Sequence, residues 1–211
     1  KDIKKDQLYF LYGLTQYQLS KTIFPLSDLT KDEVRELASK NNLPTKSAKE
    51  SQDICFIQRP LTTGEYISNC FEEKKGDIKL YPTGEKLGEH SGFYRYTLGQ
   101  RKGLRVAYSE PLYVKDIDVE NNTVYLATKK ETMIDKINIS DLNIFGEIRE
   151  SEFRAKVKIR YNMAKKPATI RMQDNYAEIL LDEPVLIQSK CQIGVVYDLI
   201  DGHIILGGTI L

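Results

Sequence analysis

One cysteine in the first third of the chain has neighbours suited to thiol chemistry. Cys55 lies in the stretch Ser51–Ile57 (SQDICFI), between apolar residues and just after a polar segment. Lys46 and Lys49 precede it, and nearby cations favour the thiolate, which is the reactive form of cysteine. A free cysteine is also among the most commonly buried residues, and in that setting it is inert. The residues alone leave both alternatives open, a reactive thiolate and a packing residue.

A basic strand near the C-terminal end is the second candidate for function. Residues 153–161 alternate apolar side chains with Arg154, Lys156, Lys158 and Arg160. Because side chains alternate across a strand, these four cations share one face. Residues 153–173 together hold seven cations and no acid. Such a face is either a solvated surface that prevents edge pairing or a surface that follows nucleic-acid phosphates. We favour the phosphate-binding interpretation because the net charge of the whole chain is only +1.

A second basic stretch lies in the middle of the chain. Arg101 and Lys102 belong to the segment Leu98–Leu104, in which Gly99 and Gly103 permit a tight turn. These two cations are candidate phosphate ligands, and a purely structural loop is the equal alternative.

The composition is that of a globular protein with a sizeable core. The 211 residues are 41% hydrophobic and 29% charged, and the overall charge indicates neither a nucleic-acid nor a membrane partner. No apolar run reaches membrane-spanning length. Three irregularly spaced cysteines argue for a reducing compartment rather than a disulfide scaffold, and two histidines without a CxxC pair argue against a metal site. Since the chain opens on Lys1, we expect the natural N-terminus to lie upstream.

The elements that position these residues begin with helices. Apolar spacing predicts a helix over Lys5–Ile23, and Thr30 with Glu33 forms a capping box that starts a second helix. Its residues Val34, Leu37 and Ala38 are expected to face a core. A polar loop then leads to Cys55. Thr63 is expected to cap a further short helix, on which Cys70 is interpreted as a packing residue.

From residue 76 onward the pattern changes to strands. Two hairpins are predicted, Asp77–Tyr81 with Lys86–His90 and Pro111–Val119 with Thr123–Thr128, and His90 is read as an ordinary polar residue at a strand end. Six short strands follow: Lys136–Ile139, Phe153–Tyr161, Ala168–Met172, Tyr176–Leu181, Gln192–Tyr197 and His203–Leu211. Their spacing predicts a small antiparallel barrel. The fold class is therefore α+β, with an N-terminal helical segment (1–57), a small β-rich central domain (58–135) and a C-terminal antiparallel β-barrel (136–211).

Several stretches, in order, resemble the bacterial-type tRNA-specific 2-thiouridylases. The resemblance spans all 211 residues. Its motifs are Lys5–Tyr12 (KDQLYFLY), Phe24–Leu26, Ser51–Ile57, Thr97–Leu104 (TLGQRKGL), Asn121–Tyr125, Lys158–Tyr161 (KIRY), Asp182–Pro184 and Leu206–Gly208. The SQDICFI motif is unchanged from the family pattern.

The resemblance implies a sulfurtransferase that modifies the wobble uridine of tRNA. ATP adenylates the C2 oxygen of the uracil, and persulfide sulfur carried by one cysteine then displaces it. Cys55 matches the second cysteine, which receives or releases that sulfur through a disulfide. A sulfur-donor protein, a cytoplasmic location and a monomer are also expected. ATP binding is expected upstream of Lys1, with no cofactor in this chain, which by itself should be inactive.

The resemblance also implies tRNA contacts by position. Lys5, Asp6 and Gln7 match residues near the target base, Arg160 and Tyr161 match contacts in the barrel, and Gln192 matches a further contact. At two positions the sequence departs from the family. Cys191 stands where the family often has glycine before this glutamine, and it would be strained if the turn needs a positive φ, which would weaken the Gln192 assignment. Arg105 to Ala107 replace a glycine-rich stretch, so that loop is expected to be shaped differently.

Two other functions compete with this interpretation. One is a non-catalytic, translation-factor-like tRNA-binding module in which Cys55 is merely buried. The other is a stand-alone cysteine enzyme, which would need a base near Cys55, and neither histidine is close in sequence.

Overall fold

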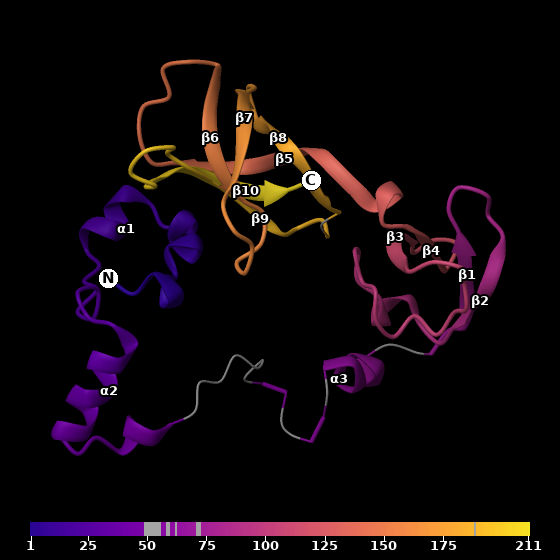
Figure 1. Ribbon diagram of the computed structural model, residues 1–211, viewed down its shortest axis with the longest axis horizontal. Helices are drawn as coiled ribbons and strands as arrows, with labels where there is room; N and C mark the ends of the chain where they lie inside the picture. Colours follow the sequence, from indigo (N-terminus) through magenta and orange to yellow (C-terminus); the bar gives the residue numbers. More distant parts are fainter. Residues whose placement is uncertain (49–55, 58–59, 62, 71–72, 188) are drawn as a thin grey trace.

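The chain folds into an N-terminal helical part, a small sheet and a closed barrel (Figure 1). The computed structural model describes residues 1–48, 56–57, 60–61, 63–70, 73–187 and 189–211. Cys55, the predicted catalytic residue, lies outside the described residues. The arrangement confirms the α+β class and the C-terminal antiparallel barrel. The described helices are too short and too polar to cross a membrane.

The N-terminal part is a series of short helices rather than the single helix predicted over Lys5–Ile23. The helices are η1 (Ile3–Lys5), η2 (Leu8–Gly13), α1 (Gln16–Ser20), α2 (Lys31–Lys40), η3 (Pro44–Ser47) and α3 (Thr63–Cys70). The prediction is wrong because Thr15 starts a helix of its own. Its hydroxyl accepts from the Gln18 backbone N–H, and the Gln18 side chain accepts in return from the Thr15 backbone N–H. A capping box of this kind ends one segment and begins another.

Helix α2 begins as predicted but does not face a core. The Thr30 hydroxyl accepts from the Glu33 N–H at 3.3 Å, and the Glu33 carboxylate accepts from the Thr30 N–H at 2.6 Å. No residue of α2 is buried, and Leu37 is 45% exposed. Figure 1 shows that α2 lies apart from both the barrel and the central sheet. Cys70 on α3 is also exposed, which corrects its interpretation as a packing residue.

The central sheet contains both predicted hairpins, joined by a parallel pair. Its order is β2-β1-β4-β3. The strands are β1 (Gly76–Leu80), β2 (Lys86–His90), β3 (Leu112–Asp118) and β4 (Thr123–Thr128), with β1 parallel to β4. His90 ends β2 but is buried, and its Nε2 lies 3.2 Å from the Asn122 carbonyl oxygen. Burial lowers the pKa of His90, so this ring is a neutral part of the sheet rather than an ordinary polar surface residue.

The barrel closes in the order β10-β5-β8-β7-β6-β9. Its strands are β5 (Met133–Ile144), β6 (Glu152–Lys158), β7 (Lys166–Met172), β8 (Tyr176–Leu186), β9 (Ile193–Tyr197) and β10 (Ile204–Ile210). The predicted alternation on β6 is confirmed, since Ala155, Val157 and Ile159 are fully buried in the barrel core. β6 ends at Lys158, which leaves Arg160 and Tyr161 on the turn that follows it.

The turn before β9 contains the strain expected from the departure at residue 191. Cys191 has φ 63°, in the left-handed region that favours glycine. Arg105, the other departure from the family pattern, has φ 55°. Since a Cβ in this region crowds the carbonyl oxygen that follows, Cys191 pays a conformational cost that glycine would not.

Replacing Cys191 with glycine should therefore stabilise the protein. We expect the free energy of unfolding to rise by up to about 1 kcal/mol. Relief of the left-handed strain stabilises the folded state, and the larger conformational entropy of glycine in the unfolded state offsets part of that gain. Urea denaturation of the two proteins measures it. Cys191→Ser is the matched control, because it removes the thiol and keeps the Cβ, and it should not be stabilising. A Cys191→Gly protein no more stable than Cys191→Ser would contradict the strain.

Candidate nucleic-acid interface

The N-terminal part is docked onto the barrel by an aromatic residue of η2. Tyr9 is 4% exposed and packs with Val195, Tyr197 and Ile204 of the barrel. Its hydroxyl donates to the Ile193 carbonyl oxygen at 2.8 Å. Burial raises the pKa of Tyr9 to about 12, so the hydroxyl keeps the proton that it donates. This contact joins residues 184 positions apart in the chain.

Two residues of the barrel wall hold the end of the same helix. The Asn143 amide donates to the carbonyl oxygens of Tyr12 at 2.6 Å and Leu14 at 2.9 Å. The last carbonyl groups of a helix have no hydrogen-bond partner within the helix, and the Asn143 amide supplies one for two of them. Tyr12 lies directly against Gly207 on β10, where a Cβ would be 2.6 Å from its Cδ2 atom. We call Leu8–Leu14, held in this way, the docking segment.

Docking brings the predicted tRNA-contacting residues to one end of the barrel. Lys5 ends η1, Asp6 and Gln7 lie between η1 and η2, and all three residues are exposed. The Tyr161 hydroxyl donates to the Asp6 carbonyl oxygen at 3.3 Å, and Arg160 is exposed beside it. Gln192 is also exposed and directly precedes Ile193, which accepts from Tyr9, but the positive φ of Cys191 weakens its assignment as a tRNA contact. The six non-catalytic candidates therefore lie around the docking segment: Lys5, Asp6, Gln7, Arg160, Tyr161 and Gln192.

Three of the seven cations of the predicted basic face are neutralised by acids from neighbouring strands. Arg154 forms two hydrogen bonds, of 2.6 and 2.5 Å, with the carboxylate of Asp182. The same holds for Lys166 with Glu183 and for Arg171 with Glu152 and Glu178. The segment 153–173 contains no acid, but the surface that it forms does contain acids, and they lie beside Arg154, Lys166 and Arg171. The acids lie outside residues 153–173 and reach the cations through strand pairing, which composition within one segment does not reveal.

Three of the other four cations of this face are held by backbone carbonyl oxygens instead. The Lys156 amino group donates to Leu199 at 2.9 Å, Lys158 to Tyr161 at 3.0 Å and Lys165 to Gly202 at 3.2 Å. We call these three the carbonyl-held lysines. A carbonyl orients an ammonium group without cancelling its charge, so these lysines stay cationic. None of them forms an ion pair within the described part of the chain, and neither does Arg160.

The carbonyl-held lysines are close enough to repel one another. The Lys165 amino group lies 3.9 Å from the ring centroid of Tyr197. Burial lowers the pKa of Lys165, with Asp6 opposing that shift. Repulsion from Lys158 and Lys156 adds to the lowering of this pKa. A ligand with several negative charges would relieve the repulsion, and a row of phosphates is such a ligand.

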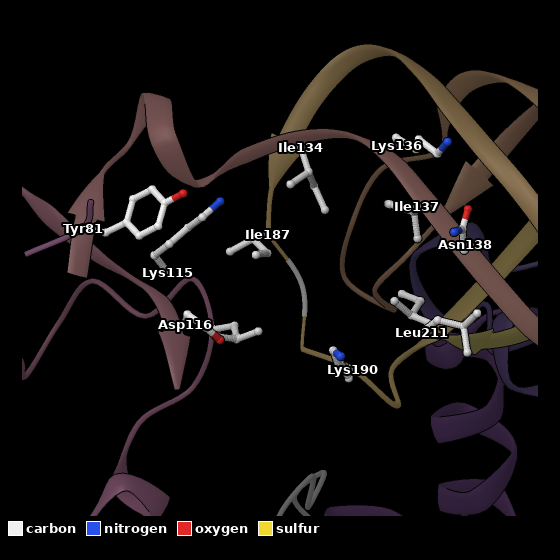
Figure 2. Close-up of a pocket in the computed structure, with 12 residues that line it drawn as sticks. Tyr81, Lys115, Asp116, Ile134, Lys136, Ile137, Asn138, Ile187, Lys190 and Leu211 are labelled. Carbon is white, nitrogen blue, oxygen red and sulfur yellow. The ribbon is translucent and has the colours of Figure 1, made fainter. Parts of the chain in front are cut away.

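A cleft between the central sheet and the barrel is the main alternative site. Figure 2 shows Tyr81, Lys115 and Asp116 on the sheet side, and Ile134 and Lys190 among the residues on the barrel side. Its volume is about 490 Å³. One of its three lysines is neutralised, because Lys136 pairs with Glu178, whereas Lys115 donates to a backbone carbonyl oxygen, that of Glu131, as the carbonyl-held lysines do. The cleft contains none of the six candidates, so we favour the barrel end.

The central basic loop is held by its own hydrogen bonds. The Gln100 side chain accepts from the Thr97 N–H at 3.0 Å and donates to the Lys102 carbonyl oxygen at 2.9 Å. Gly99 and Gly103 both have positive φ, as the expected tight turn requires. These bonds support the structural interpretation of the loop, and phosphate binding by Arg101 and Lys102 stays a prediction.

The start of α2 does not fit the phosphates of ATP. A nucleotide-binding helix offers open backbone N–H groups after a glycine-rich turn. The start of α2 is instead closed by acidic side chains, because Glu33 accepts from Thr30 and Asp2 accepts from Lys31. The oxygens of Asp198 and Asp201 near His203 are likewise used within their turn, where they accept from backbone N–H groups. We assign no cofactor or metal to either place.

Three family models match consecutive parts of the chain. The model described as a tRNA methyl transferase HUP domain matches residues 1–59. The one described as a tRNA methyl transferase PRC-barrel domain matches residues 64–128. The third, described as an aminomethyltransferase beta-barrel domain, matches residues 134–211 and so coincides with the closed barrel.

Curated relatives match almost the whole chain. It is 43% identical to tRNA-specific 2-thiouridylase MnmA 1 of Thermoanaerobacter sp. (strain X514), over 98% of this chain and 57% of that protein. It is 36% identical to the MnmA of Hydrogenobaculum sp. (strain Y04AAS1), over 99% and 59%. It is 38% identical to that of Rippkaea orientalis (strain PCC 8801 / RF-1), over 100% and 60%. The chain thus spans about three fifths of the length of these relatives, and with all three regions present in order it belongs to the tRNA-specific 2-thiouridylase family.

Proposed function

We propose that this chain is the tRNA-binding portion of a 2-thiouridylase that transfers sulfur to C2 of the wobble uridine after ATP-dependent adenylation. One observation carries this proposal. The six candidate residues, the carbonyl-held lysines and the docking segment lie together at one end of the barrel. The relatives are named tRNA-specific 2-thiouridylases. We place the activity in the cytoplasm, with tRNA and a sulfur-donor protein as partners.

In the proposed reaction Cys55 completes the sulfur transfer. Adenylation supplies a good leaving group at the C2 oxygen of the uracil. The terminal sulfur of a persulfide on a partner cysteine then bonds to C2 as the C–O bond breaks. The Cys55 thiolate attacks the sulfur atom that belongs to the partner cysteine. That S–S bond breaks, its electron pair stays with the sulfur on the uridine, and a protein disulfide forms. A dithiol reductant returns the two cysteines to thiols.

The chain's own residues would hold the anticodon arm during this reaction. Arg160 and the carbonyl-held lysines bind phosphates, which gives affinity without reading the sequence. Lys5, Asp6 and Gln7 are exposed next to Tyr161 and contact the bases and riboses near the target. We assign ATP binding and the partner cysteine to a region of the relatives that this chain does not cover.

Removing one phosphate contact should weaken tRNA binding and reduce its dependence on salt. For Arg160→Ala we expect a loss of about fivefold in affinity, equivalent to about 1 kcal/mol, and a salt slope smaller by about one. Titration of an unmodified tRNA transcript by fluorescence anisotropy at several salt concentrations measures both quantities.

Arg154→Ala is the matched control. It removes the same charge from the same face, but Arg154 is already paired with Asp182. Its salt slope should be close to that of the unchanged protein. Equal slopes for all three proteins would mean that the basic face is only solvated surface.

A further inference from the structure

The docking segment and the barrel together form an exposed aromatic surface. Phe10 is 51% exposed although it is a large apolar side chain. Its ring centroid lies 4.8 Å from that of Tyr161, with 35° between the ring planes. Tyr9 meets the Phe10 ring edge-on, with centroids 5.3 Å apart and an interplanar angle of 84°. Phe10 is therefore supported on two sides by rings, while about half of its surface faces solvent.

The rings behind Phe10 are fixed in place. Tyr9 is anchored to Ile193 and Tyr161 to Asp6 through their hydroxyl groups. A rigid aromatic group loses little conformational entropy when a planar ligand stacks on it. Phe10 is thus prepared to accept a flat partner.

The charges around this surface select the kind of partner. The Lys158 amino group lies 5.7 Å from the Tyr161 ring centroid, and Arg160 is the preceding residue. Neither cation has an acidic partner in the described part of the chain. An exposed ring beside cations that are not neutralised suits a base that stacks while its own phosphate is bound nearby. In a duplex the base faces are covered by their neighbours, so this surface would accept an unpaired base.

We propose that Phe10, backed by Tyr9 and Tyr161, is a stacking site for one unpaired nucleobase of the bound RNA. The inference rests on the proposed function and extends it, because it assigns a base contact to a residue that has no role in the charge-based binding. It also predicts that the chain prefers single-stranded to double-stranded RNA.

The test compares two RNA probes and three variants. The probes are a fluorescein-labelled single-stranded RNA of about 10 nucleotides, within the range of sites on small barrels, and the duplex of the same sequence. For Phe10→Ala we expect the single strand to bind about fivefold more weakly or worse, the low end of one base–aromatic stack, with an unchanged salt slope. Phe10→Trp should restore the affinity. Duplex binding should not change.

Phe24→Ala is the matched control, since Phe24 is the same residue type and is 46% exposed. It should bind both probes as the unchanged protein does. Equal single-strand affinity for Phe10→Ala and the unchanged protein would overturn the stacking site and leave the proposed function intact. Equal losses for the single strand and the duplex, with no rescue by tryptophan, would also overturn it, since Phe10 would then act only on the fold. If the unchanged protein binds neither these probes nor a tRNA transcript, the proposed function itself fails.

Discussion

A methyl group added at Gly207 is expected to detach the docking segment from the barrel. The Cβ of Gly207→Ala would lie 2.6 Å from Cδ2 and 2.7 Å from Cβ of Tyr12. The latter atom is next to the backbone, so a rotation of the tyrosine ring cannot relieve the overlap. We expect the protein to lose about 1–3 kcal/mol of stability, the usual cost of overpacking a buried site. Amide exchange of residues 8–14 should become fast while that of the barrel strands stays slow.

Gly13→Ala is the control for a methyl group in the same region. A Cβ at Gly13 meets no atom within 4 Å, so this variant should exchange like the unchanged protein. A double variant, Gly207→Ala with Tyr12→Ala, should be more stable than the two separate losses would predict if added together, because removing the ring removes the clash. Additive losses, or unchanged exchange in Gly207→Ala, would mean that Tyr12 does not hold the segment on β10.

Detachment should also weaken RNA binding, although Gly207 itself is buried. Lys5, Asp6 and Gln7 belong to the N-terminal part, whereas Arg160, Tyr161 and Gln192 belong to the barrel. The docking segment is what holds these two groups next to each other. If the segment moves freely, bringing the two groups together costs conformational entropy each time RNA binds. The N-terminal residues then contribute little, and the barrel cations alone would set the affinity.

Local patterns predicted local structure well. The capping box of Thr30 and Glu33 formed because both partners lie within one turn, and the alternation of Ala155 and Val157 formed because a strand imposes it. The positive φ of Cys191 was also within reach, since the resemblance often places a glycine at this position. Each of these features depends on residues that are neighbours in sequence.

Features that depend on distant residues could not be predicted in the same way. The pairing of Arg154 with Asp182 joins two strands, and with the pairs of Lys166 and Arg171 it neutralises three of the seven cations of the basic face. Nothing near Asn143 in the sequence indicates that its side chain holds Tyr12 and Leu14, more than 125 residues away. The one available signal for the docking segment was the Leu206–Gly208 motif, because paired glycines in a strand often mark a close approach of another backbone or ring.

Loss of the Cys55 thiol should abolish sulfur transfer and leave tRNA binding intact. In an enzyme that contains this chain together with the ATP-binding region of its relatives, Cys55→Ser should reduce the thiolation rate by at least about 1,000-fold, as the loss of an attacking nucleophile commonly does. A hydroxyl cannot form the disulfide that releases the transferred sulfur. Affinity for the tRNA should change by less than twofold, because phosphate contacts supply most of it. Mass spectrometry of the product tRNA and anisotropy titration measure the two effects separately.

The chain offers two matched controls for this experiment. Cys70 and Cys191 are both exposed and free of disulfides, so each is accessible to the same reagents as a reactive thiol. If solvent exposure alone allowed a cysteine to take part in sulfur transfer, Cys70→Ser or Cys191→Ser would also slow the reaction. The proposed mechanism requires both variants to keep the full rate, because only Cys55 lies in the SQDICFI motif behind Lys46 and Lys49. A Cys55→Ser enzyme that still thiolates tRNA but no longer binds it would reverse the assignment, and the cysteine would then belong to the binding surface.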